Sequence, residues 1–366
     1  MKGHKFYAGH DGTKFAYGGC PPLEKLHIYL TSRCNEQCQH CWVEAGPEQT
    51  ARLAAPEVNR QINLAMPLGL QSLKITGGEP LLYKGETLSI LSHAAGAGIV
   101  SKLETNGVLI TNTMAAELAK LGCVVSISID GASSESHDAF RRTKGSFDRR
   151  LHSVEKLISE GCIVEAVSCI HRGNVHQVHK IVSLCNCLGI SYLKFNFPSR
   201  YGRAIRLADS GMLLSTAEIL RTIRRLEQRY PLGNTSMELD FDIPRALRMY
   251  PRDGLRCKVM NLISILPDGR YSLCGIGVTH KDITFGTIKQ QDIDEVWRES
   301  EVLTGLRNAI SDGRKGVCGI CTQYDACLGH CAAYMISEFG SINAQHPLCQ
   351  DAYDRGLFPE NFLKVL

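Results

Sequence analysis

Between residues 25 and 230, short β-branched runs alternate with longer amphipathic stretches. The β-branched runs predict six strands, at Lys25–Thr31, Ser72–Thr76, Val100–Glu104, Val124–Ile129, Val164–Ile170 and Tyr192–Phe197. The amphipathic stretches predict six helices, at residues 55–66, 87–97, 112–121, 147–160, 175–188 and 215–229. Six strand–helix units in series favour a parallel sheet with helices packed outside it.

Polar residues whose side chains could bind a ligand or take part in catalysis follow nearly every predicted strand. Active sites of strand–helix barrels lie at the C-terminal ends of the strands, and right-handed crossovers curl a parallel sheet. The pattern therefore predicts an α/β fold with a partial (β/α)6 TIM-like barrel over residues 25–230, rather than a flat doubly wound sheet. Residues 1–24 would form an N-terminal extension.

The pattern changes after residue 230, where prolines and glycines break the periodicity. Seven of the sixteen cysteines fall between residues 257 and 349. Because this segment has a low density of apolar residues, we expect bound metal clusters to supply its stability. The predicted layout is a linker over 231–256, a small loop-rich iron–sulfur domain over 257–349, and a tail over 350–366.

Cys34, Cys38 and Cys41 lie in one short loop directly after the first predicted strand, with the spacing C-x3-C-x2-C. Cysteine is the usual ligand of iron–sulfur clusters. Three thiolates would hold three irons of a [4Fe–4S] cube and leave the fourth iron open to a small molecule. The alternative is a structural zinc loop, for which His40 is available as a fourth, tetrahedral ligand.

Composition narrows the class of protein and its compartment. With 366 residues, 44% hydrophobic and 21% charged, the chain can bury one large core and a smaller module. No apolar run approaches the ~20 residues of a membrane helix, and the first residues lack the apolar stretch of a signal peptide. We expect a cytoplasmic protein, in which disulfides are rare, so the cysteines indicate metal binding.

The net charge of +4 is unevenly distributed, because residues 141–256 hold 20 Lys and Arg against 11 Asp and Glu. Solvated helix faces explain part of this excess. The alternative is a basic mouth for an acidic partner, either a carboxylate-rich peptide or an organic acid. Aromatic residues are not interleaved with the basic ones, which argues against nucleic acid.

Three motifs follow the second, third and fourth predicted strands: Thr76-Gly-Gly-Glu-Pro80, Glu104-Thr-Asn-Gly107 and Ser126-Ile-Ser-Ile-Asp-Gly131. Glycines let a backbone approach a ligand closely, and the polar side chains suit an ammonium group, ribose hydroxyls and a carboxylate. Together with the three-cysteine loop, these motifs resemble the radical S-adenosylmethionine (SAM) superfamily across residues 25–230. The resemblance implies SAM contacts from Gly77, Gly78, Glu79, Asn106, Ser128, Asp130 and Arg141.

That resemblance also implies a reaction. The open iron of the cluster would bind the amino and carboxylate groups of SAM. An electron from the cluster would split the sulfur–C5′ bond, giving methionine and a 5′-deoxyadenosyl radical that removes hydrogen from a C–H bond.

The C-terminal cysteines follow the order C…G-x4-C…C-x2-C-x5-C-x3-C…C, with Gly269 as the glycine. This order resembles the SPASM domain of peptide-modifying radical SAM enzymes. The resemblance implies an outer auxiliary [4Fe–4S] cluster on Cys318, Cys321, Cys327 and Cys349, and an inner one on Cys257, Cys274 and Cys331. No further cysteine lies between 257 and 274, so the inner cluster is expected to keep an open iron for Asp268, His280, water or a substrate thiolate.

Three residues at the end of the fifth predicted strand are candidates for the catalytic site. Cys169 would act as a hydrogen-atom donor, and His171 and Arg172 would touch the substrate. The resemblance favours a maturase that cross-links or oxidises a ribosomally made peptide, with a Cys-containing peptide as one option. A flavodoxin- or ferredoxin-type protein would supply electrons.

Several alternatives stay open. Fewer than 35 residues precede the first cluster loop, where many peptide maturases carry a leader-binding domain, so either a separate recognition protein or a substrate without such a leader is expected. Sulfatase-maturase-like oxidation is a second reading, although those enzymes carry an aspartate where this chain has Gly275. Side-chain chemistry on a tetrapyrrole and a non-catalytic iron–sulfur electron carrier are the others.

Overall fold

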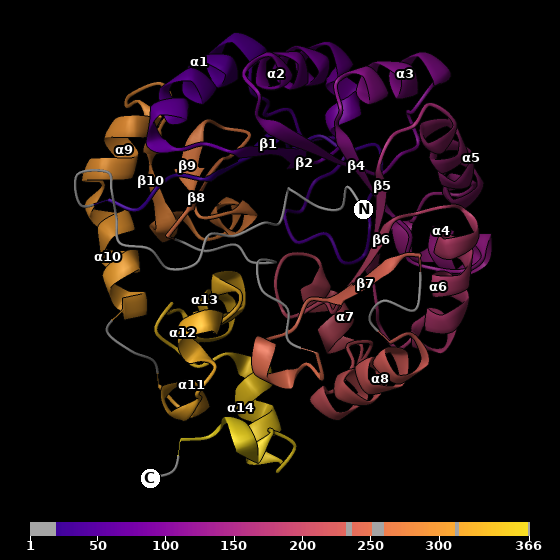
Figure 1. Ribbon diagram of the computed structural model, residues 1–366, viewed down its shortest axis with the longest axis vertical. Helices are drawn as coiled ribbons and strands as arrows, with labels where there is room; N and C mark the ends of the chain where they lie inside the picture. The colour runs from indigo at the N-terminus through magenta and orange to yellow at the C-terminus, as the bar shows by residue number, and fades with distance from the viewer. Residues whose placement is uncertain (1–19, 232–235, 251–259, 312–314, 365–366) are drawn as a thin grey trace.

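The computed structural model describes residues 20–231, 236–250, 260–311 and 315–364, and within them ten strands form one open sheet (Figure 1). The strands are β1 Lys25–Thr31, β2 Ser72–Gly77, β3 Val100–Thr105, β4 Val124–Ser128, β5 Val164–Cys169, β6 Tyr192–Asn196, β7 Glu238–Phe241, β8 Leu262–Ile265, β9 Arg270–Ser272 and β10 Thr284–Thr287. Their spatial order is β10-β9-β8-β1-β2-β3-β4-β5-β6-β7.

Helices lie along the outer side of the curved sheet, and those of the C-terminal third lie beside its opening (Figure 1). They are α1 Ala55–Ala65, α2 Lys84–Gly96, α3 Asn112–Lys120, α4 Ser134–Arg141, α5 Ser146–Ser159, α6 Val178–Cys187, α7 Ala204–Asp209, α8 Thr216–Arg229, α9 Ile293–Glu299, α10 Glu301–Ser311, α11 Val317–Ile320, α12 Tyr324–Cys327, α13 Ala332–Phe339 and α14 Pro347–Asp354. In the part of the chain that the structure describes, no helix has both the length and the apolar character needed to cross a bilayer.

The predicted partial barrel is confirmed. All six predicted strands are present within one residue of their expected bounds, and β1 to β7 pair in parallel, each with the next. The six predicted helices are present as well, as α1, α2, α3, α5, α6 and α8.

The sheet extends beyond the six predicted strands at both edges. On one edge β7 pairs with β6; on the other β8 pairs in parallel with β1, so the C-terminal segment joins the sheet of the barrel. Ile263 and Trp297 belong to the same buried core as Leu26 of β1. Apolar packing thus holds this segment to the barrel, and the stabilising role expected for metal clusters there stays a prediction.

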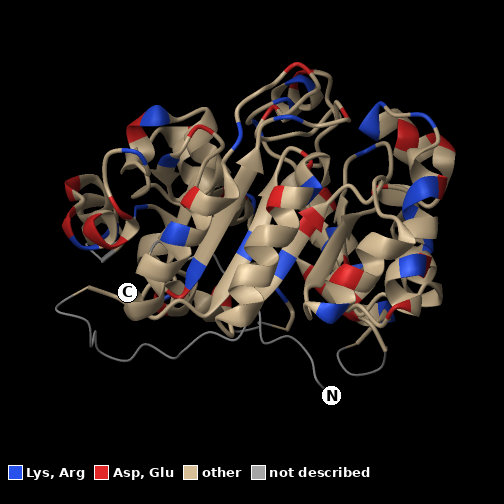
Figure 2. Cartoon of the chain, turned by 90° about the horizontal axis from the view of Figure 1, so that it is seen from above, with Lys and Arg blue, Asp and Glu red and all other residues tan. Residues whose placement is uncertain are grey.

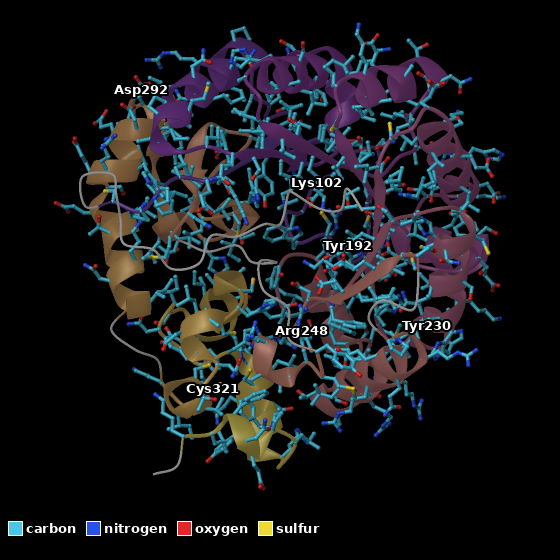
Figure 3. All side chains as sticks on the ribbon, in the orientation of Figure 1. Lys102, Tyr192, Tyr230, Arg248, Asp292 and Cys321 are labelled. Atoms are coloured by element: carbon cyan, nitrogen blue, oxygen red, sulfur yellow. The ribbon has the colours of Figure 1, made fainter. Side chains whose placement is uncertain are left out.

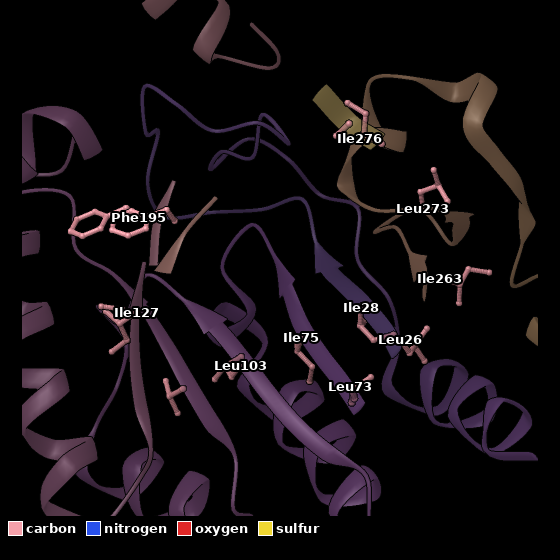
Figure 4. Close-up of a cluster of buried hydrophobic side chains, with 14 of the residues drawn as sticks. Leu26, Ile28, Leu73, Ile75, Leu103, Ile127, Phe195, Ile263, Leu273 and Ile276 are labelled. Atoms are coloured by element: carbon pink, nitrogen blue, oxygen red, sulfur yellow. The ribbon is translucent and has the colours of Figure 1, made fainter. Parts of the chain in front are cut away.

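Apolar and polar residues alternate along β1, β2 and β6. Leu26, Ile28, Leu73, Ile75, Leu103 and Ile127 form a buried apolar band on neighbouring strands (Figure 4). Parallel sheets that are buried on both faces usually read as continuous apolar runs. Here the residues between the apolar ones line cavities, so the inner face of the sheet is polar.

Candidate functional site

The loop after β1 brings Cys34, Cys38 and Cys41 to one cavity of about 290 Å³. Cys34 and Cys38 are 8% and 7% exposed. A residue of the segment after β6, far away in the sequence, holds this loop. Arg203 donates from Nε to the carbonyl of Cys38 at 2.8 Å and from Nη1 to that of Ala45 at 2.7 Å. These hydrogen bonds fix the backbone of the loop, and its three thiols line the same cavity.

The thiols fit an iron–sulfur cube better than a single zinc ion. A zinc ion with bonds of about 2.3 Å holds its ligand atoms within about 4 Å of one another. Among the described residues, the group whose ligand atoms lie within 4.8 Å of each other is His40, Asp130 and Cys169, not the three loop cysteines. His40 stacks on Phe140 with ring centroids 4.5 Å apart. Burial raises the pKa of the Cys38 thiol to about 11, so a bound metal centre would be what deprotonates it.

The trio of His40, Asp130 and Cys169 does not make a second metal site. Both carboxylate oxygens of Asp130 are already used: Arg141 Nε donates to one at 2.5 Å and the backbone N–H of Cys169 to the other at 2.7 Å. Although burial opposes it, the Arg141 guanidinium holds the pKa of Asp130 well below its usual range. The Asp130 carboxylate is therefore a charged partner of Arg141.

A buried charge network connects the cysteine loop with α4 and α5. Glu36, which lies between two of the cysteines, accepts from Arg150 Nη2 at 2.6 and 2.7 Å, and neither side chain is exposed. Arg150 Nη1 contacts His137 Nε2 at 2.6 Å. Arg141 Nη1 lies 3.4 Å from Cys38 Sγ. Sequence reasoning missed Glu36 and Arg150, since a glutamate and an arginine 114 residues apart give no signal of pairing.

Replacing Glu36 by alanine is expected to lower the free energy of unfolding by about 3–5 kcal/mol, because it leaves the buried Arg150 without its counter-charge. The measurement is chemical denaturation of the anaerobic protein. Asp209→Ala, which breaks the exposed ion pair with Arg200, is the matched control and should cost at most about 1 kcal/mol. Equal losses in the two variants would contradict a stabilising role for the Glu36–Arg150 pair.

The glycines after β2 pack directly against the cysteine loop. A Cβ on Gly78 would lie 2.0 Å from the carbonyl oxygen of Arg33, and the Gly78 N–H donates to the Thr31 carbonyl at 2.6 Å. Gly77, Gly78, Asn106, Ser128 and Arg141, five of the seven predicted SAM contacts, line the same cavity as the three cysteines. The structure thus brings these predicted residues together.

Glu79 and Asp130 were also predicted to contact SAM, but neither lines this cavity. The buried Glu79 carboxylate accepts from Leu81 N, Thr105 Oγ1 and Asn106 N at 2.7–2.9 Å. It ties the loop after β2 to the loop after β3. Burial raises the pKa of Glu79, and those hydrogen bonds oppose the rise. From these positions both carboxylates support the site, and their contact with SAM stays a prediction.

Of the three predicted catalytic residues, only Cys169 lines the cavity. Burial raises its pKa well above the usual value, so it is a thiol rather than a thiolate. His171 stacks on Phe140 at 4.1 Å, and Arg172 forms a half-exposed ion pair with Glu218. Their predicted contact with substrate is untested, and their positions do not favour it.

A second cavity, of about 260 Å³, lies between the barrel and the C-terminal segment. Cys274 and Cys331, two predicted ligands of the inner cluster, line it; the third, Cys257, lies outside the described residues. The two cavities adjoin, because they share His27, His40, Trp42, Lys74, Glu104, Cys169, Lys194 and Asn196.

The four predicted outer ligands, Cys318, Cys321, Cys327 and Cys349, line a third and smaller cavity together. The other candidates for the inner cluster have partners elsewhere. Asp268 accepts from Arg270 Nε at 2.7 Å, and His280 Nδ1 lies 3.0 Å from Thr279 Oγ1.

The basic residues of segment 141–256 have different kinds of partner, and the basic mouth stays a prediction. Arg141 and Arg203 bind the cysteine loop, whereas Arg200 pairs with the exposed Asp209. Acidic and basic residues are interspersed along the helices and loops in the cartoon of Figure 2. The excess of positive charge in this part of the chain therefore has several separate structural causes.

Comparison with known proteins agrees with this geometry. Residues 28–185 match the family model described as the radical SAM superfamily, and residues 257–327 match an iron–sulfur cluster-binding domain, SPASM. An AdoMet-dependent heme synthase of Oleidesulfovibrio alaskensis is 28% identical over 90% of this chain and 88% of its own. Mycofactocin maturase MftC of Mycolicibacterium smegmatis is 28% identical over 88% and 82%. The fold resembles Streptococcus suis SuiB bound to its precursor peptide SuiA, with a TM-score of 0.72, 19% identity, and coverage of 90% of this chain and 76% of that one.

Proposed function

Because this chain carries a radical SAM domain followed by a SPASM domain, we propose that it is a maturase that abstracts hydrogen from a ribosomally made peptide, leaving a cross-link or an oxidised residue. The observation that carries the proposal is the pair of adjoining cavities. One holds the three loop cysteines, and the other reaches the C-terminal cysteines. A substrate in the shared space would lie between two metal centres.

The domains imply three [4Fe–4S] clusters, one for SAM and two auxiliary, together with SAM itself. When bound, the first cluster and SAM supply a 5′-deoxyadenosyl radical. In this chain Cys34, Cys38 and Cys41 would hold that cluster. Gly77 and Gly78 would admit the methionine end of SAM, because a side chain there would displace the cysteine loop.

The remaining residues of the cavity position and shield the reactants. Asn106 Nδ2 is held by Asn35 Oδ1 at 2.7 Å, and its backbone by Glu79, so the loop that faces the SAM ribose is fixed before binding. Arg141 is fixed by Asp130 and would face the SAM carboxylate. Trp42 and Tyr201, in contact at 6.0 Å between ring centroids, line the second cavity and would exclude water from it.

Relatives named as peptide maturases support the peptide as substrate, and the fold shared with SuiB is compatible with it. Relatives named as heme synthases support a second candidate, a tetrapyrrole, whose flat ring the aromatic wall of the second cavity would accept. A sulfatase-maturase-like reaction has less support. A Cβ on Gly275, where that type carries aspartate, would lie 2.7 Å from atoms of Tyr29 and Val43.

The proposal is tested with anaerobically reconstituted protein, reductant and SAM. The substrates are a short peptide encoded beside the gene and an iron porphyrin with propionate side chains. We expect 5′-deoxyadenosine to form and the peptide to lose hydrogen, read by mass spectrometry. Turnover of the porphyrin alone would favour the second candidate. Failure to form 5′-deoxyadenosine under any condition would leave only an electron carrier.

A further inference from the structure

A row of polar side chains crosses the inner face of the sheet below the SAM residues. His27 of β1 is paired in register with Lys74 of β2, and Lys74 with Lys102 of β3. Side chains at the same level of parallel strands lie on the same face, and all three line the first cavity. Figure 3 shows Lys102 on the inner side of the sheet. Lys194 of β6 lines both cavities.

The ammonium groups of this row are paired but still open to the cavity. Lys74 Nζ lies 3.2 Å from Glu104 Oε1, and Lys194 Nζ lies 3.1 Å from Asp242 Oδ1. The side chains of Lys74 and Lys194 are 15% and 28% exposed, although the strands that carry them are interior. A ligand inside the cavity can therefore reach both cations.

Positive charge is in excess around the cavities. The charged side chains that line them are Lys25, Lys74, Lys102, Lys194, Arg141, Arg203, Glu36, Glu104 and Asp242. Six cations and three anions thus line the two cavities, and Lys74, Lys102, Lys194 and Arg141 each have an acidic partner. In a space of low dielectric, a group of cations attracts an anion strongly.

Two polar atoms at this level lack partners. His27 is 5% exposed. Neither its Nδ1 nor the Oδ1 of Asn196 has a hydrogen-bond partner among the described residues. Both residues line the two cavities. Burial and then the nearby lysines hold the pKa of His27 well below its usual value, so the ring is neutral and one nitrogen donates. Buried polar atoms without partners in a cavity indicate a ligand or bound water.

We propose that His27, Lys74 and Lys194 form an anion site that binds a carboxylate of the substrate. A carboxylate accepts from ammonium groups and from a neutral imidazole N–H, and charge-assisted bonds of this kind are the strong ones. The site is distinct from the one expected for the SAM carboxylate, which lies at Arg141 and Ser128 near the strand ends. Only the identity of the substrate rests on the proposed function, and the carboxylate belongs either to an acidic peptide or to a tetrapyrrole propionate.

The experiment uses the reconstituted holoenzyme saturated with SAM and two matched ligand pairs. The peptide pair is acetyl-Gly-Glu-Gly-amide and its Gln analogue, and the porphyrin pair is iron coproporphyrin III and its tetramethyl ester. Binding is measured by anaerobic calorimetry or, for the porphyrins, by difference absorption. In the unmodified protein we expect at least one acid to bind about tenfold tighter than its neutral analogue. The pair that shows the difference identifies the source of the carboxylate.

Variants then locate the effect. Lys74→Gln and Lys194→Gln should each remove most of the preference for the acid, whereas Lys194→Arg should keep it. Lys120→Gln, an exposed lysine at the end of α3, is the control and should behave as the unmodified protein. The iron content per chain reports whether each variant is folded. If Lys74→Gln loses iron, the comparison of Lys194→Gln with Lys194→Arg shows whether the positive charge at position 194 carries the preference for the acid.

Two results would overturn the proposal: acids that bind no better than their neutral analogues, or a preference that survives in both lysine-to-glutamine variants. Formation of 5′-deoxyadenosine by the unmodified protein is measured in parallel. Its absence would refute the proposed function and leave the result on carboxylate binding standing.

Discussion

Replacing Cys34, Cys38 and Cys41 together by alanine is expected to abolish the cleavage of SAM while most of the iron remains bound. The three thiols line one cavity with the glycines after β2 and would hold only the first cluster. The predicted outer ligands line a separate cavity, so the auxiliary clusters have their own cysteines. With four irons per cube, the iron content should fall from about 12 to about 8 per chain, measured anaerobically beside 5′-deoxyadenosine formation.

Cys187→Ala is the matched control, because Cys187 is exposed at the end of α6 and lines none of the cavities described above. It should keep both the full iron content and the cleavage activity. A triple variant that still formed 5′-deoxyadenosine would refute the assignment of these ligands. Zinc in the loop of the unmodified protein would refute it as well.

The barrel could be predicted from the sequence because each of its strands pairs with a neighbour that is close along the chain. Strand β8 could not be predicted in this way, because it has only four residues and its partner β1 lies more than 200 residues earlier. Long-range pairing of a short strand leaves no periodic signal in the sequence. The C-terminal segment was therefore predicted to be mostly loops.

The polar inner face did leave a signal. In Lys25-Leu-His-Ile-Tyr-Leu-Thr31 every second residue is apolar, and β2 and β6 each carry a lysine between two apolar residues. Such alternation is unusual for a parallel sheet, which is covered on both faces. Reading the strands only for β-branched residues found their bounds but not the chemistry of the cavity.

The sequence motifs identified the loops that form the site but not the direction in which each side chain points. His171 and Arg172 directly follow β5, yet the chain turns away from the cavity there. Asn174 makes this turn, since its Oδ1 accepts from His171 N and its Nδ2 donates to the carbonyls of Asp130 and Cys169, all at 2.8 Å. A turn fixed by one side chain of a nearby loop depends on tertiary structure, which spacing alone does not reveal.

Gly78→Ala is expected to reduce SAM cleavage by about a hundredfold, the effect of misplacing reacting groups by about 1 Å. The added Cβ would lie 2.0 Å from the carbonyl oxygen of Arg33 and 2.6 Å from its carbonyl carbon. These are backbone atoms directly before Cys34, so either the cysteine loop or the loop after β2 must shift. The shift would also strain the hydrogen bond from Glu79 N to that same carbonyl, now 2.8 Å long.

Gly85→Ala is the control for this substitution, because a Cβ at Gly85 meets nothing within 4 Å and the residue lies in the first turn of α2. It should leave cleavage unchanged and stabilise the helix by up to about 1 kcal/mol. Rates of 5′-deoxyadenosine formation and iron content are compared for both variants. If Gly78→Ala keeps the iron and loses cleavage, the loop after β2 seats SAM rather than the cluster. If it cleaves SAM at the rate of Gly85→Ala, the close packing of Gly78 on the cysteine loop is not what prepares the site.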